Sequence, residues 1–212
     1  MKIFSIKVVV LTLVAIFIPA ICVYSSTSFD LNKLTIALKN NNVDHVVTLL
    51  NDAKEFSNQE EIVQYINNLW VDKNAPPEVS NKLLHKSIIR INIADFLMQA
   101  YNNGNSTVHI QEIHKYAKLQ LTSHKEEVVS MALFVLAQFN DENDLKLIEP
   151  FIFSKSDYLF RSAALSLAMM CNDKVDNRME YLQKQLDSSR KHYLIETRKK
   201  FKKMKDNDGY CR

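Results

Sequence analysis

Glycine is nearly absent from this sequence: only Gly104 and Gly209 occur among 212 residues, and proline is also rare, with four residues. Tight β-turns, phosphate-binding loops and the sharp turn that presents a catalytic serine all depend on glycine's backbone freedom. The scarcity of glycine therefore argues against these structures. Asparagine, by contrast, is abundant and collects between apolar segments, as in short loops that cap helices. The composition predicts an all-α protein.

Recognisable metal-binding motifs are also missing. His109 and His114 flank Glu112, but residues five apart on a helix point about 140° away from each other, so these two histidines do not share an ion. We expect both to be solvated helix residues. The acidic run at 141–144 lacks the glycine and the late glutamate of a calcium-binding loop. Helix capping accounts for that run better.

The chain also shows no recognisable serine, histidine and acid arrangement of a hydrolase. Cys171 follows a segment rich in alanine and methionine, where core packing or a disulfide is expected rather than a nucleophile. We therefore predict no catalytic residue, no metal and no cofactor. A hydrolase whose residues meet only in space is the remaining enzymatic alternative.

The first 25 residues have the three-part form of a secretory signal peptide. Two lysines form a positive start, an apolar run follows from Val8 to Val23, and small polar residues come next. We place the cleavage after Ser25, which leaves one domain of about 187 residues, 26–212. The sequence thus predicts an exported protein, either periplasmic or secreted.

Two alternatives exist at this end of the chain. Cys22 would become the lipid-modified N-terminus of a lipoprotein, but the branched Ile21 directly before it fits such a site poorly. An uncleaved anchor is the second alternative, because the apolar run is only just shorter than the roughly 17–25 residues that span a bilayer. In each case the rest of the chain lies on the far side of a membrane.

Charge is distributed unevenly along the sequence. The formal net charge of +3 falls to about +1 without the two lysines of the signal segment. Residues 190–212 contain nine Lys or Arg against three acidic residues, so the preceding body is acidic. Because the protein is expected to be exported, we do not expect nucleic acid as its partner.

Cleavage would leave two cysteines, Cys171 and Cys211. An oxidising compartment permits a disulfide between them. Cys171 would end one predicted helix and Cys211 would follow the next helix but one, and in a stack of alternating helices those two ends lie on the same side. We predict this bond, with free thiols or a partner-linked Cys211 as the alternatives.

Apolar residues recur every three or four positions along the mature chain, as on one face of a helix. The pattern predicts about ten helices. Apolar stripes fall at 31–38, 43–50, 62–70 and 110–117, and a long helix is expected over 78–101 after a proline break. The first two stripes together resemble the helix pair of an ankyrin repeat, without that repeat's turn motif.

The C-terminal half repeats itself at a spacing of 32 residues, most clearly over 124–188. Ser130, Ala132 and Leu133 recur as Ser162, Ala164 and Leu165, and the Asn-Asp corner at 140–141 recurs at 172–173. Each copy is an alanine-rich helix, a corner and a second helix, which the corner aspartate is expected to cap. Such a pair does not bury its apolar face alone, so it is expected to stack on the next.

These repeats carry a family resemblance. Segment 157–168, with Asp157 and Arg161 ahead of an Ala-Leu stripe, resembles the first helix of a HEAT-like repeat. Segment 126–137 is similar without the arginine, and 88–97 is a fainter third copy. The resemblance covers residues 84–188. It implies an α-solenoid of stacked antiparallel helical hairpins, HEAT- or armadillo-like, and by analogy a protein-binding role.

The last predicted helix, 190–205, would close the stack with a basic outer surface. Its basic patch consists of Arg198, Lys199, Lys200, Lys202, Lys203 and Lys205, opposite the apolar Leu194, Phe201 and Met204. We expect this patch to be the solvated face of a terminal helix. Weak contact with an anionic membrane surface, or with an acidic partner, is the alternative.

Large aromatic residues are the candidates for anchoring a partner, namely Trp70, Tyr101, Tyr158 and Phe160. A core position is the expected alternative for each of them. The sequence as a whole predicts an exported, non-catalytic helical-repeat protein that binds another protein, as an inhibitor or immunity factor does. The alternative is a membrane-associated scaffold held by an uncleaved N-terminal segment and the basic helix.

Overall fold

The structure is a computed structural model that describes residues 29–71, 79, 81–171 and 173–208. These residues form α-helices and short 3-10 helices, and no strand occurs among them. The predicted all-α class is confirmed. The predicted signal segment 1–25, the proline break at 75–77 and Cys211 lie outside the described residues.

The α-helices vary from a single turn to 21 residues. They are α1 (Leu31–Lys39), α2 (Val43–Ala53), α3 (Glu60–Val71), α4 (Asn81–Leu84), α5 (Ser87–Asn102), α6 (Ile110–Gln120), α7 (Glu126–Phe139), α8 (Glu142–Ile148), α9 (Asp157–Met169), α10 (Asp173–Leu182) and α11 (Ser188–Asp208). Three 3-10 helices continue α2, α8 and α10: η1 (Lys54–Phe56), η2 (Glu149–Phe153) and η3 (Gln183–Gln185).

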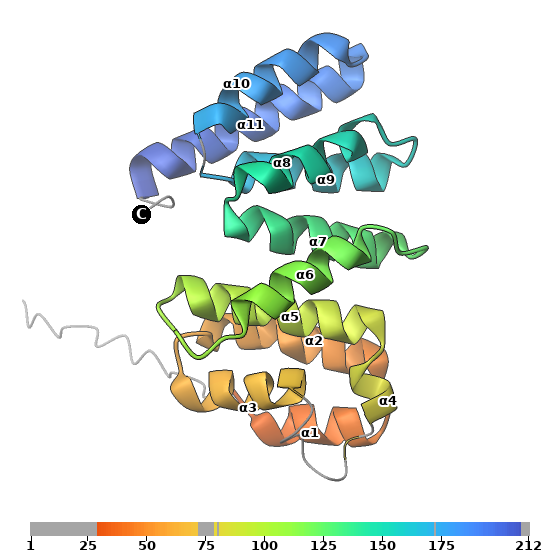
Figure 1. The fold of residues 1–212 in the computed structure, drawn as a ribbon, viewed down its shortest axis with the longest axis vertical. Helices are drawn as coiled ribbons and strands as arrows, with labels where there is room; N and C mark the ends of the chain where they lie inside the picture. The colour runs from red at the N-terminus through yellow and green to blue at the C-terminus, as the bar shows by residue number, and fades with distance from the viewer. Residues whose placement is uncertain (1–28, 72–78, 80, 172, 209–212) are drawn as a thin grey trace, which may run out of the picture.

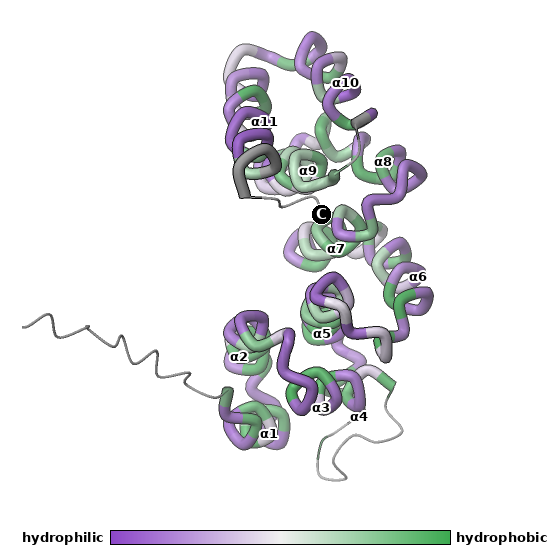
Figure 2. Tube along the Cα trace, turned by 90° about the vertical axis from the view of Figure 1, so that its left-hand side faces the viewer, coloured by the Kyte–Doolittle hydropathy of each residue, from purple (hydrophilic) through white to green (hydrophobic). Residues whose placement is uncertain are grey.

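The helices follow one another along the long axis of the molecule, from α1 at one end to α10 and α11 at the other (Figure 1). The first row consists of α2, α5, α7, α9 and α11, which pack in succession. The second row consists of α3, α6, α8 and α10, which lie beside the first row and pack on it (Figure 2). One apolar core runs through both rows, from Leu34 in α1 to Leu194 in α11. Each helix thus buries its apolar face on neighbours along the stack, as repeated hairpins do.

Asparagine serves at helix ends where glycine is more usual. Asn41 after α1 and Asn140 after α7 have φ angles of 52° and 55°, in the left-handed region that short polar side chains tolerate. At helix starts, the side chains of Asn42 and Asp141 accept backbone N–H groups of α2 and α8 at 3.2 and 2.9 Å. Asp141 therefore caps α8 as predicted, whereas Asp173 is itself the first residue of α10.

Residues 32 positions apart meet across neighbouring helices in the C-terminal half. The buried hydroxyl oxygens of Ser130 in α7 and Ser162 in α9 lie 2.8 Å apart. Lys174 Nζ in α10 lies 2.6 Å from the carboxylate of Glu142 in α8. The spacing found in the sequence therefore corresponds to one step within each row, from α7 to α9 and from α8 to α10.

The prediction of one long helix over 78–101 is wrong. The segment contains α4 and α5, separated at His85 and Lys86, whose backbone is extended at Lys86 (ψ 125°). Leu84 and Ile89 are both fully buried. Neither glycine nor proline marks this break, and apolar spacing alone did not reveal it.

Candidate binding groove

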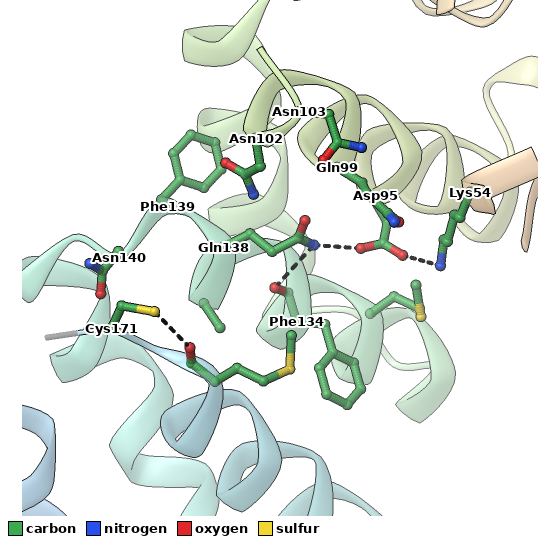
Figure 3. Close-up of a pocket in the computed structure, with 13 residues that line it drawn as sticks. Lys54, Asp95, Gln99, Asn102, Asn103, Phe134, Gln138, Phe139, Asn140 and Cys171 are labelled. Carbon is green, nitrogen blue, oxygen red and sulfur yellow. Dashed lines mark hydrogen bonds and ion pairs between the residues drawn. The ribbon is translucent and has the colours of Figure 1, made fainter. Parts of the chain in front are cut away.

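A groove opens where α5, α7 and α9 end (Figure 3). Its volume is about 1000 Å³. The lining residues come from η1, α5, α7 and α9 and from the residues just after the last three helices. They are Lys54, Asp95, Gln99, Asn102, Asn103, Met131, Phe134, Ala137, Gln138, Phe139, Asn140, Met169 and Cys171. Residues far apart in the sequence therefore share one surface.

Three helices of one row end at this groove. α5, α7 and α9 end at Asn102, Phe139 and Met169, which line it, while η1 continues α2 from Lys54. Backbone N–H groups of the following residues pair several of the last carbonyls, among them those of Gln99, Ala100 and Tyr101 in α5 and that of Ala137 in α7.

The charged side chains of the groove neutralise each other. Asp95 in α5 is only 7% exposed and forms an ion pair with Lys54. Gln138 in α7 donates a hydrogen bond of 2.6 Å from Nε2 to the Asp95 carboxylate (Figure 3). A buried carboxylate is costly unless it is paired and hydrogen-bonded, and here both conditions are met. Asp95 thus joins three consecutive members of the stack: η1, α5 and α7.

Five carboxamide side chains line the same groove, and most of their hydrogen-bonding capacity is open. Those of Gln99, Asn102 and Asn140 make no hydrogen bond with any residue in the described part of the chain. Asn103 uses its Nδ2 on the hydroxyl of Ser57 at 2.8 Å, and Gln138 uses its Nε2 on Asp95, so each keeps a carbonyl oxygen. The groove therefore presents several donors and acceptors to a ligand.

Apolar side chains form the rest of the lining. Met131, Phe134 and Met169 are partly buried and expose the remainder of their surface to the groove. Cys171 lies beside them, with Sγ 3.7 Å from the carbonyl oxygen of Met169. Its predicted disulfide partner, Cys211, is outside the described residues, so that bond stays a prediction.

Two of the four aromatic candidates belong to the core. Trp70 is 2% exposed, packs edge-on against Tyr116 with ring centroids 5.6 Å apart, and lies under the guanidinium of Arg90 at 4.3 Å. Burial raises the pKa of Tyr116 to about 12, although the nearby Arg90 acts in the opposite direction. Phe160 is 1% exposed and packs on Tyr193. Trp70 and Phe160 are therefore core residues, which was the alternative to a role in partner binding.

Tyr101 and Tyr158 are the exposed members of that set, at 42% and 49%. Tyr101 stands in the last turn of α5, and Tyr158 in the first turn of α9. Neither lines the groove. They are surface aromatics, and their role in binding stays a prediction.

The basic patch on α11 is partly paired. Arg198 lies 3.2 Å from Asp176 and 3.9 Å from Glu180, both in α10, and Lys199 lies 2.9 Å from Glu196. Lys200, Lys202 and Lys203 are exposed, and the side chain of Lys205 is outside the described set. Leu194 is buried, and Phe201 and Met204 are partly buried, so the apolar stripe is where it was predicted.

The prediction that both His109 and His114 are solvated is wrong for His114. Its Nε2 lies 2.6 Å from the carboxylate of Asp144, and its ring stacks on Phe139 with centroids 4.2 Å apart. Asp144 is fully buried, and its other oxygen lies 3.0 Å from Lys118 Nζ. Sequence reasoning missed this because Asp144 is 30 positions away, on α8.

His114, Asp141 and Asp144 also bring three potential ligand atoms within 4.8 Å of one another. Both oxygens of Asp144 already face the imidazole and the ammonium of Lys118. A metal ion would therefore have to compete with Lys118 for the Asp144 carboxylate. We therefore attribute the cluster to helix capping and ion pairing rather than to a metal centre.

Sequence reasoning interpreted the asparagines only as helix caps and did not find the groove. A usable signal did exist, since carboxamides cluster at the ends of two predicted helices, around 99–103 and 138–140. Their convergence, however, depends on the parallel packing of α5 and α7, which spacing within one helix does not reveal.

No family model, no curated protein and no solved structure matches this chain. Within the described part, no helix is both long and apolar enough to cross a membrane.

Proposed function

We propose that this chain is an exported, non-catalytic helical-repeat protein, HEAT-like in construction, that binds a segment of another protein in the groove. One observation carries the proposal: the carboxamides of Gln99, Asn102 and Asn140 open into one groove without hydrogen-bond partners among the described residues. Asn102 and Asn140 are exposed, so a partner can reach them and form hydrogen bonds with them.

The lining combines two kinds of side chain. Carboxamides of α5 and α7 lie in the same groove as the adaptable side chains of Met131 and Met169. Such a surface suits a long, irregular ligand that makes many moderate contacts.

Two further observations support export and a repeat construction. The segment 1–25 has the form of a signal peptide, which supports export. The 32-residue spacing, together with the contact between Ser130 and Ser162, supports a repeat construction. Within this class we favour an inhibitor or immunity factor that blocks a toxin or enzyme, because a small exported binding protein suits that role.

The test is a co-purification from the native host with three forms of the protein. The first is the wild type, and the second is a groove variant with Asn102→Ala and Asn140→Gly. The third is a matched control with Gln111→Ala and Asn177→Ala, which removes two exposed carboxamides that do not line the groove. Glycine is used at Asn140 because it keeps the left-handed backbone there.

We expect one stoichiometric protein with the wild type and the control, and much less of it with the groove variant. Sequencing of the mature N-terminus in the same preparation tests export, with cleavage near Ser25 expected. Recovery of only lipid or envelope protein, released by salt, would instead favour the membrane-scaffold alternative and the basic patch. Equal recovery of the partner by all three forms would place its binding outside the groove.

A further inference from the structure

One asparagine differs from all the others in its sequence context. Asn105, Ser106 and Thr107 form an Asn-X-Thr triplet, and no other asparagine of the sequence has serine or threonine two positions later. In a protein that enters a secretory compartment, such a triplet is the acceptor for N-linked sugar, provided that its middle residue is not proline. The middle residue here is Ser106, so the triplet meets this requirement.

The triplet lies in the surface loop between α5 and α6. Ser106 and Thr107 are exposed, and so is Gly104 before them, while Asn105 is partly buried. A Cβ added at Gly104 would meet no other heavy atom within 4 Å, so the loop has open space beside it. A sugar chain is bulky and hydrophilic, and it requires such a surface position.

Thr107 holds the side chain of Asn105 in one orientation. Asn105 Oδ1 accepts a hydrogen bond of 2.6 Å from Thr107 Oγ1 and one of 3.0 Å from the backbone N–H of Thr107. Both bonds use the oxygen, and Asn105 Nδ2 makes no hydrogen bond with any residue in the described ranges. Nδ2 is also not buried. The nitrogen that would carry the sugar is therefore accessible.

The same two hydrogen bonds have a purely structural use. An asparagine side chain that accepts the backbone N–H two residues later forms an Asx-turn, which redirects a chain without any modification. The turn alone therefore does not distinguish a modified asparagine from a loop residue. The triplet, its exposure and the accessible Nδ2 together favour the modified residue.

We infer that Asn105 is the acceptor for an N-linked oligosaccharide that is attached during export. Asn105 Nδ2 bonds to the anomeric carbon of an oligosaccharide carried by a polyprenyl diphosphate. The bond from that carbon to the diphosphate oxygen breaks, the diphosphate leaves with the electron pair, and Nδ2 releases one proton. The inference rests on the export part of the proposed function and is independent of the groove.

The test is mass spectrometry of the protein purified from its native host. We expect the intact protein to be heavier than the unmodified mature chain by the mass of the sugar. Peptide-N-glycosidase removes an N-linked sugar and converts the asparagine that carried it to aspartate. We expect this conversion at Asn105, located in the peptide that contains it.

Substitutions in the triplet separate the modification from the turn. Asn105→Gln should remove the added mass entirely, and Thr107→Ala should do so although Asn105 remains. Thr107→Ser keeps a hydroxyl in the third position and should retain the added mass. Asn58→Gln is the control, because Asn58 is exposed in a turn outside any such triplet, and it should change nothing. Circular dichroism establishes that each variant is folded.

The wild-type measurement decides the inference without any variant. An unmodified Asn105 would overturn it, and the mature N-terminus, sequenced in the same preparation, then decides about export. Cleavage near Ser25 would leave export standing, whereas an uncleaved chain recovered from the cytoplasm would overturn export as well. Added mass that survives Asn105→Gln would place the modification elsewhere and would also overturn the inference.

Discussion

Asp144 connects the helices of the second row, and its removal tests how that row is held together. The side chain is fully buried in the first turn of α8 and lies 2.6 Å from His114 Nε2 and 3.0 Å from Lys118 Nζ, both on α6. A hydrogen bond to a charged group contributes about 1.5–3 kcal/mol. Lys118 is 37% exposed, so water replaces much of its share. We therefore expect Asp144→Ala to lower the free energy of unfolding by about 2–3 kcal/mol, mostly through the His114 contact.

Urea denaturation followed by tryptophan fluorescence measures this loss. Trp70 is the only tryptophan and is 2% exposed against Tyr116, so its emission reports on the core. With a slope of about 2 kcal/mol per molar urea, the midpoint should fall by about 1–1.5 M while the slope stays constant. A changed slope would indicate loss of two-state behaviour instead of a local effect.

Asp141→Ala is the comparison, because Asp141 caps the start of the same helix, although it also lies near His114 and Lys118. That substitution should cost about 1 kcal/mol. A loss for Asp144→Ala no larger than this would refute the importance of the buried ion pairs. The same assay decides the nature of the cluster: Zn²⁺ or Ca²⁺ should leave the wild-type midpoint unchanged, and a rise with either ion would show that His114, Asp141 and Asp144 bind metal.

The remaining predictions concern three other parts of the stack. Because the pKa of Tyr116 is raised to about 12 by burial, its stabilising effect should be complete below about pH 10 and decline as pH rises toward 12. An ultraviolet phenolate titration should show a late-titrating tyrosine that Tyr116→Phe removes, while Tyr65, whose pKa burial also raises, keeps its own late contribution in that variant. Ser162→Ala should destabilise by about 1 kcal/mol, but the double variant with Ser130→Ala should cost less than the sum of the singles, because no buried hydroxyl is then left alone. If Cys171 and Cys211 form the predicted disulfide, the denatured, non-reduced protein should react with no thiol reagent at these positions, and two reactive thiols would contradict the bond.

The sequence by itself determined the local structure. Apolar spacing of three and four residues located the helices, because one face of each must be buried. The Asn-Asp corner at 140–141 marked a helix boundary correctly, since Asp141 accepts a backbone N–H of α8 and Asn140 takes the left-handed conformation. The 32-residue spacing even indicated that Ser130 and Ser162 are equivalent positions, which then proved to be in contact.

Tertiary structure alone decided which side chains meet. The break at Lys86 has no signal in the apolar spacing, and Leu84 and Ile89 on its two sides are both fully buried. His114 is held by Asp144 from another helix, although its own neighbours suggested a solvated position. The groove arises in the same way, because carboxamides that look like separate caps in the sequence lie together only when the ends of α5 and α7 are packed side by side. Periodicity reports which face of a helix is buried, whereas contacts between helices depend on packing across distant parts of the chain.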